Sequence, residues 1–282
     1  MWRATLLRVK QRSTEDNLSV VAAGVAFYAM LAVFPALIAL VGLYGLAFDP
    51  QQVHEHLATL TAVLPEQAAD LIGRQVRAIT SADRTSLGLG SLAGLVVALW
   101  SASAALRALM TALDVAYDEH EERGLLRFYG TSLALTLAAI GGVAAAIGLI
   151  VAVPAALRFA GLGGAAESLL SYGRWPLLAA LMFAGLALLY RYGPSRPPPV
   201  WRWMNWGAAV AVALWLAGSA LFSLYVSAFA SYNRTYGSLG AVVILLLWFL
   251  LSAYAVLLGA ELNAELRGRR RQGARSLQRQ AA

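Results

Sequence analysis

Residues 18–48 read LSVVAAGVAFYAMLAVFPALIALVGLYGLAF, a stretch without a single charged side chain. A helix that crosses the hydrocarbon core of a bilayer needs about 20 consecutive, mostly apolar residues. The apolar region of a secretory signal peptide is shorter, at about 7–15 residues. The stretch therefore predicts a transmembrane helix that is retained in the mature protein.

Five further uncharged stretches follow, at residues 85–106, 128–157, 175–190, 203–233 and 235–260. The shortest is flanked by Arg174 and Arg191, whose long side chains can reach the membrane interface. The chain is 60% hydrophobic and 13% charged, against about 45–50% and about 25% in soluble domains. We expect an all-α, polytopic membrane protein whose six transmembrane helices span about residues 18–47, 87–110, 128–153, 174–192, 203–228 and 238–260.

The basic residues indicate how these helices are oriented. Most of the 22 Lys and Arg residues fall in segments 1–17, 107–127, 191–202 and 261–282. Short loops and tails on the cytoplasmic side of a membrane carry an excess of Lys and Arg. This pattern places both ends in the cytoplasm and divides the chain into an N-terminal cytoplasmic segment (1–17), a transmembrane domain (18–262) and a basic cytoplasmic tail (263–282).

The segment between the first two predicted spans, residues 49–86, has a different pattern. After Pro65, Leu71 and Ile72 recur on one side of a helical projection, and Asp70 and Arg74 lie on the other. This is the pattern of an amphipathic helix, which can lie on the membrane interface. We expect extracytoplasmic amphipathic helices here, either as a packing cap or as a lid.

Polar and helix-bending residues within the spans, and polar residues at their ends, are candidates for transport or gating. Arg107 and Glu261 stand at cytoplasmic ends of the second and sixth helices. Ionisable groups at membrane depth usually pair or reach the interface, so Arg107 is expected to pair with Glu261 or Asp114, or to act as a plain anchor. The full candidate set is Tyr28, Pro35, Ser101, Ser103, Arg107, Tyr232, Asn233, Tyr236, Gly237, Glu261 and Asn263.

The sequence lacks the parts of the usual catalytic and metal chemistries. It has no Cys and three His, and no metalloprotease, hydrolase or nucleotide-binding motif. His54 and His56 would point to nearly opposite sides of a helix. We therefore expect no catalytic residues, no cofactor, no metal and no nucleic-acid partner. A small-residue face at Gly90 and Gly94 leaves either internal packing or a homo-oligomer open.

The stretch YGSLGAVVILLLWFLLSAYAVLLGAELNAEL, residues 236–266, closely resembles the closing signature of the YihY/BrkB membrane protein family. Residues 22–40, 99–123 and 190–208 resemble other parts of the same family. The resemblance implies six spans in a bacterial inner membrane. It also implies a set of signature positions without a settled role, namely Tyr236, Gly237, Gly240, Gly259, Glu261 and Asn263.

The same resemblance bears on function. The family is described as transporters or exporters, and its older label of ribonuclease BN is regarded as mistaken. Our leading hypothesis is a transporter or exporter of an unidentified solute or lipid, with the lipid bilayer and that substrate as partners. The alternative is a scaffold that organises envelope enzymes without transporting anything. A ribonuclease is the third and least supported hypothesis.

Overall fold

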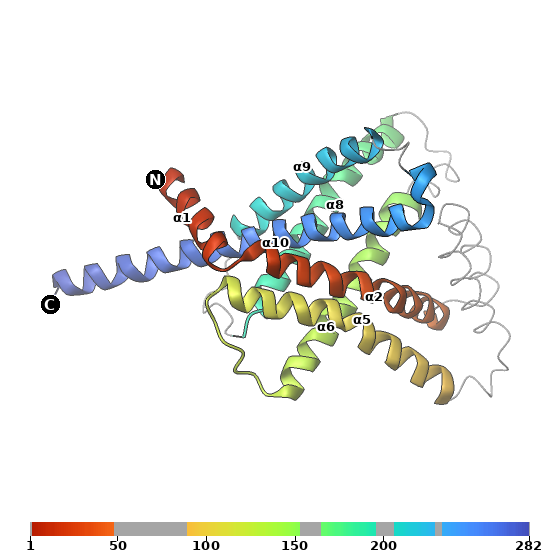
Figure 1. Cartoon of the computed structure of the whole chain (residues 1–282), viewed down its shortest axis with the longest axis horizontal. Helices are drawn as coiled ribbons and strands as arrows, with labels where there is room; N and C mark the ends of the chain where they lie inside the picture. Colours follow the sequence, from red (N-terminus) through yellow and green to blue (C-terminus); the bar gives the residue numbers. More distant parts are fainter. Residues whose placement is uncertain (1, 48–88, 153–164, 196–205, 229–232, 282) are drawn as a thin grey trace.

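The computed structural model describes residues 2–47, 89–152, 165–195, 206–228 and 233–281, and all the regular elements within these ranges are helices (Figure 1). They are α1 (Trp2–Glu15), α2 (Leu18–Ala47), α5 (Leu89–Ala116), α6 (Leu125–Ile147) with the π-helical turn η1 (Gly148–Ala152), α8 (Ala165–Tyr192), α9 (Trp206–Ala228) and α10 (Asn233–Ala281).

Six of these helices are long and apolar enough to cross a membrane. Their apolar spans are Leu18–Leu37, Gly94–Ala116, Leu125–Ile150, Trp175–Tyr192, Trp206–Ser227 and Val242–Gly268. Large apolar side chains such as Leu221 and Leu224 stay exposed on the spans, as expected where a helix faces lipid instead of water. The predicted all-α architecture with six transmembrane helices is confirmed.

The core of the bundle forms where α2, α5 and α10 meet and where α9 packs against α10. Leu18, Leu113, Tyr190 and Leu257 are almost fully buried in it. The two termini lie on the same side of the bundle, where α1 and the C-terminal part of α10 extend beyond it (Figure 1). We call this side the terminal end. Both ends on one side agree with an even number of spans, and their cytoplasmic placement stays a prediction.

Two helix boundaries differ from those expected. The last helix does not end near residue 260, and the basic tail continues α10 without a break to Ala281, since residues 261–267 are mostly strong helix formers. The fourth span, expected to start near residue 174, belongs to a helix that begins at Ala165, so Pro176 lies inside α8. Membrane helices tolerate such a proline because neighbouring groups satisfy the freed carbonyl.

A tight turn at Asn17 separates α1 from α2. Asn17 has a φ of 48°, a left-handed conformation that asparagine adopts more readily than most residues. Its carbonyl accepts hydrogen bonds from the backbone N–H groups of Val20 and Val21, which starts α2. The turn lets α1 leave the line of α2 and pack against α10. The amphipathic helices expected in residues 49–86 lie outside the described residues.

Candidate functional site

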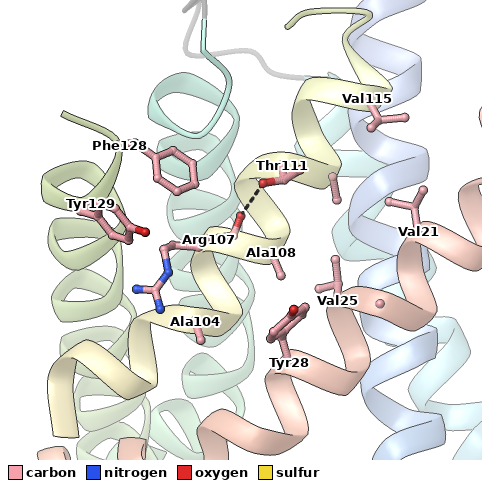
Figure 2. A pocket seen from close by; sticks show the side chains of 12 residues that line it. Val21, Val25, Tyr28, Ala104, Arg107, Ala108, Thr111, Val115, Phe128 and Tyr129 are labelled. Carbon is pink, nitrogen blue, oxygen red and sulfur yellow. Dashed lines mark hydrogen bonds between the residues drawn. The ribbon is translucent and has the colours of Figure 1, made fainter. Parts of the chain in front are cut away.

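A cavity of about 530 Å³ lies between α2, α5 and α6 (Figure 2). Pockets that hold small molecules typically measure about 300–1,000 Å³. Gly24 and Tyr28 on α2 and Thr111 on α5 line it and are exposed, although all three belong to apolar spans. Exposed positions on a span face lipid, so the cavity opens sideways towards the bilayer. We call it the groove.

Arg107 on α5 is the charged residue of the groove lining. It stands nine residues before the end of α5 at Ala116, about 13 Å along a helix that rises 1.5 Å per residue. This places it within the span and not at its rim. An arginine at the centre of a membrane helix costs about 2.5–3.5 kcal/mol on insertion scales, so its contacts must offset part of that cost.

Two aromatic rings and two oxygens surround the Arg107 guanidinium. Its central carbon lies 5.2 Å from the ring centroid of Trp100 and 5.3 Å from that of Tyr129, and these two rings stack on each other. Such cation–π contacts stabilise by about 0.5–2 kcal/mol each. Nη1 donates to the Trp100 carbonyl at 3.3 Å and to the Ser103 hydroxyl. Figure 2 shows the side chain extending from α5 towards Tyr129.

The expected pairing of Arg107 with Glu261 or Asp114 is wrong, because both carboxylates pair with other arginines. Glu261 lies beside Arg12 and Asp114 beside Arg123. Within the described part of the chain, Arg107 forms no ion pair with a carboxylate. The groove therefore contains a positive charge that these residues do not neutralise.

A second polar cluster holds α1 against α10 at the terminal end. The Arg8 Nε lies 3.3 Å from a Glu265 carboxylate oxygen, and the Arg12 Nε lies 3.5 Å from one of Glu261. The two pairs are one helical turn apart on both helices. Glu261 is fully buried, and neither of its carboxylate oxygens has a hydrogen-bond partner among the described residues. Arg12 is thus the basic side chain that pairs with this buried carboxyl.

Asn263 and Gly259 fix the crossing of α9 and α10. The Asn263 Oδ1 accepts a hydrogen bond from the backbone N–H of Gly207 at 2.9 Å, and its Nδ2 donates to the Tyr117 hydroxyl at 3.4 Å. A methyl group on Gly259 would lie 2.5 Å from the Gly207 carbonyl oxygen, so the helices touch backbone to backbone, as glycine permits in membrane bundles. These two signature positions have a structural role here.

A third group of polar contacts ties the α5–α6 connection to the end of α8. The Asp114 Oδ1 accepts from the Ser195 backbone N–H at 2.6 Å. Arg123 lies 3.6 Å from Asp114, pairs with Glu121 at 2.6 Å, and donates to the Gly193 carbonyl. The hydrogen bonds from Arg123 hold the pKa of Glu121 below its usual value. Nearby, burial raises the pKa of Tyr117 to about 12, which keeps its hydroxyl neutral.

The candidate residues thus fall into two places. Tyr28 and Arg107 line the groove and Ser103 supports Arg107 from behind, whereas Glu261 and Asn263 belong to the contacts of α10 at the terminal end. Of the remaining candidates, Pro35 lies inside α2 and Ser101 on α5, and neither is part of the groove lining. Asn233, Tyr236 and Gly237 belong to the first turns of α10. Tyr232 and the pair His54 and His56 lie outside the described residues.

Sequence reasoning missed the aromatic partners of Arg107. Trp100 precedes Arg107 by seven residues, which is two helical turns and the same face. That spacing is a signal that could have paired them. Tyr129 lies on another helix, and nothing local in the sequence connects it to Arg107. Among the residues that the structure places, no cluster of three metal-ligating side chains occurs.

Six apolar spans, three of which border a lateral groove that contains an arginine, define a multi-pass membrane protein. The profile of the family described as "Virulence factor BrkB" matches residues 9–282. The chain belongs to this BrkB family of bacterial membrane proteins, as its closing signature predicted.

Individual relatives agree with the family match. The chain is 33% identical to the ribonuclease-like protein YfkH of Bacillus subtilis over 254 residues, which cover 88% of this chain and 90% of that protein. It is 28% identical to a UPF0761 membrane protein of Idiomarina loihiensis, over 91% of this chain and 88% of the relative. It is 30% identical to a UPF0761 membrane protein of Verminephrobacter eiseniae, over 94% of this chain and 62% of the relative. No solved structure matches this chain.

Proposed function

We propose that this protein is a transporter or exporter whose substrate enters the groove between α2, α5 and α6 from the side. The observation that carries the proposal is the groove itself, a cavity of about 530 Å³ at membrane depth with a cation in its lining. A bundle that only holds partners together has no use for such a space, because a packed interior stabilises it better.

The lining of the groove suggests a substrate with both apolar and polar parts. Val21, Val25 and Phe128 supply apolar wall, whereas Tyr28 and Arg107 supply polar groups. A small polar solute would leave the apolar wall unused, and a plain hydrocarbon would leave the arginine without a partner. An amphipathic molecule satisfies both, so a lipid or lipid-like solute fits the groove best.

The proposed function is not enzymatic. Cleaving RNA needs groups in hydrogen-bond reach of the reacting atoms that can donate and accept protons. The carboxylates Asp114, Glu261 and Glu265 are instead paired with arginines and largely buried. The name of YfkH describes that relative, and no described feature of this chain supports a ribonuclease.

Reconstitution tests the proposal directly. Purified protein in liposomes should accelerate the passage of at least one labelled lipid or amphipathic solute between the two sides, compared with protein-free liposomes. The transporter hypothesis would be contradicted if, in a broad panel of lipids and polar solutes, none moved faster with the protein than without it.

An envelope scaffold is the second candidate. It is favoured by α1 and the C-terminal part of α10, which extend beyond the bundle at the terminal end (Figure 1) and carry many basic residues. Co-purification with a defined partner, together with full cellular function of Arg107→Gln and Glu261→Gln variants, would support the scaffold over the transporter.

A further inference from the structure

Building on the proposed function, we propose that the groove binds an anionic membrane lipid from the leaflet at the terminal end, with the negatively charged headgroup held by Arg107. The proposal names a substrate class and a binding residue, and it rests on three features of the groove. These are the charge that Arg107 places there, the hydrogen-bond donors it leaves unused, and the shape of the space beside it.

The charge of Arg107 selects an anion. The carboxylates of Glu261 and Asp114 pair with other arginines. Among the described residues, Arg107 contacts the ring faces of Trp100 and Tyr129 and the neutral oxygens of Trp100 and Ser103. These contacts orient the guanidinium without cancelling its charge. A zwitterionic headgroup would bring its own cation to a place where no described residue offers a carboxylate, whereas an anionic one meets only the arginine.

The guanidinium also keeps the donors that a phosphate requires. Among the described residues, Nη1 is the Arg107 nitrogen that donates hydrogen bonds, to Trp100 and Ser103. Nη2 and Nε donate to none of the described residues and so remain for a ligand. Arginine binds phosphate oxygens through two parallel N–H donors, so the guanidinium is prepared for such a headgroup. Basic pockets between membrane helices are a known means of holding anionic headgroups.

The depth of Arg107 distinguishes a lipid site from an ordinary interface anchor. The residue stands about 13 Å from the end of α5, taking a rise of 1.5 Å per residue over the nine residues to Ala116. A headgroup that reaches it must leave its usual level and enter the bundle. The sideways opening at Gly24 and Tyr28 provides that path, and it lets the acyl chains stay in the bilayer.

The space beside the arginine is kept open by small residues. Ala104 and Ala108 lie on α5 between Arg107 and Tyr28 (Figure 2). A methyl group built on Gly24 meets nothing within 4 Å, so the α2 side is open too. The Tyr28 hydroxyl makes no hydrogen bond to any described residue and faces this space. It offers a second polar group at the opposite edge of the groove.

Binding of short-chain lipids to the purified, full-length protein tests the proposal. Native mass spectrometry would count dioctanoyl phosphatidylglycerol, dioctanoyl phosphatidylcholine and inorganic phosphate bound to wild type, Arg107→Gln, Arg107→Lys and Arg127→Gln. Arg127 is an exposed arginine near the start of α6 that does not line the groove, so Arg127→Gln is a matched control for charge.

We expect one phosphatidylglycerol per chain, with an affinity that falls about tenfold or more in Arg107→Gln, as for loss of a charge-assisted hydrogen bond. Arg107→Lys should retain only part of the affinity, because it keeps the charge but loses the paired donors, and Arg127→Gln should retain all of it. Equal binding of the two lipids, or equal effects of Arg107→Gln and Arg127→Gln, would overturn the proposal. So would inorganic phosphate that binds as tightly as the lipid, or a change of oligomeric state in Arg107→Gln in place of a change in lipid binding.

Gly24→Phe provides a second variant in case Arg107→Gln does not fold. It fills the groove without altering Arg107, and it should abolish phosphatidylglycerol binding; retained binding would contradict the proposed site. The outcome also separates the two proposals. Lipid binding at Arg107 without movement in liposomes would contradict transport and leave the site, whereas transport without preference for anionic lipid would contradict the site alone.

Discussion

The crossing of α9 and α10 leaves no room for a methyl group at Gly259. A Cβ at this position would lie 2.5 Å from the Gly207 carbonyl oxygen, 2.5 Å from the Tyr190 hydroxyl and 2.8 Å from the Ala211 Cβ. The Gly207 oxygen is part of the backbone. The Tyr190 hydroxyl is held in place because it donates a hydrogen bond to the Val256 carbonyl at 2.6 Å. Neither atom can move away easily. Gly259→Ala must therefore push the two helices apart.

The cost of Gly259→Ala has two parts. Overpacking of a close-packed site costs about 1–3 kcal/mol. Separation of the helices also weakens the buried hydrogen bonds of Tyr190 and Asn263, and an unmet buried polar group costs about 1–3 kcal/mol. The two parts together give an expected loss of about 2–6 kcal/mol in unfolding free energy, which corresponds to a fall on the order of 10 °C in Tm.

Gly218→Ala is the matched control. Gly218 lies on α9, and the nearest atom to its Cβ would be the flexible Leu251 Cδ2 at 3.1 Å. Both variants gain the same small helix propensity, so their difference isolates the close approach. Thermal and denaturant unfolding in detergent would measure it, and Gly218→Ala should change stability by less than about 1 kcal/mol. Equal losses in the two variants would refute the argument that backbone contact at Gly259 fixes this crossing.

Three further predictions concern the charged clusters. Asp114→Ala should cost about 1–3 kcal/mol in denaturant unfolding because it leaves the buried Ser195 N–H without this acceptor, while Arg123 keeps Glu121 as a partner; Asp114→Asn should cost less. The pKa of Glu121 lies below 4.5 in the folded protein because of its hydrogen bonds to Arg123. The ionised carboxylate therefore stabilises the folded state above pH 4.5, and this stabilisation is lost as the pH falls through the folded-state pKa. Glu121→Gln should flatten that part of a Tm-against-pH profile. Arg12→Gln should cost about 1–3 kcal/mol because the buried Glu261 carboxyl loses its basic partner, and the double variant with Glu261→Gln should recover most of it in a double-mutant cycle; a double variant as unstable as the sum would contradict this pairing.

The sequence predicted the architecture because its signal is local. Each span is a run of apolar residues, and the six runs can be recognised without knowing which helices contact each other. The end of the last helix was missed for the converse reason. Charged residues begin directly after Ala260 in the sequence, but α10 continues to Ala281 because its backbone hydrogen bonds form within the helix and do not require apolar side chains.

The candidate site could be predicted only in part. Arg107 was identified because a charge at membrane depth is unusual on any helix. Its partners could not be identified in the same way, since Tyr129 comes from another helix. Glu261 is recognisable in the same way, but Arg12 is one of several basic residues of the N-terminal segment, and nothing local in the sequence pairs the two. A turn at Asn17 brings α1 back to α10, and such a return depends on tertiary packing.

The groove is the feature on which the account depends, and Gly24→Phe in liposomes tests it most directly. The measurement is the rate at which dithionite bleaches inner-leaflet NBD-labelled phosphatidylglycerol in vesicles that contain the protein. The matched control is Gly141→Phe, since Gly141 lies on α6 outside the groove lining and also has open space around its Cβ. The account predicts that wild type and Gly141→Phe move the lipid and that Gly24→Phe falls to the rate of protein-free vesicles. Equal rates for Gly24→Phe and Gly141→Phe, with both proteins folded, would contradict it.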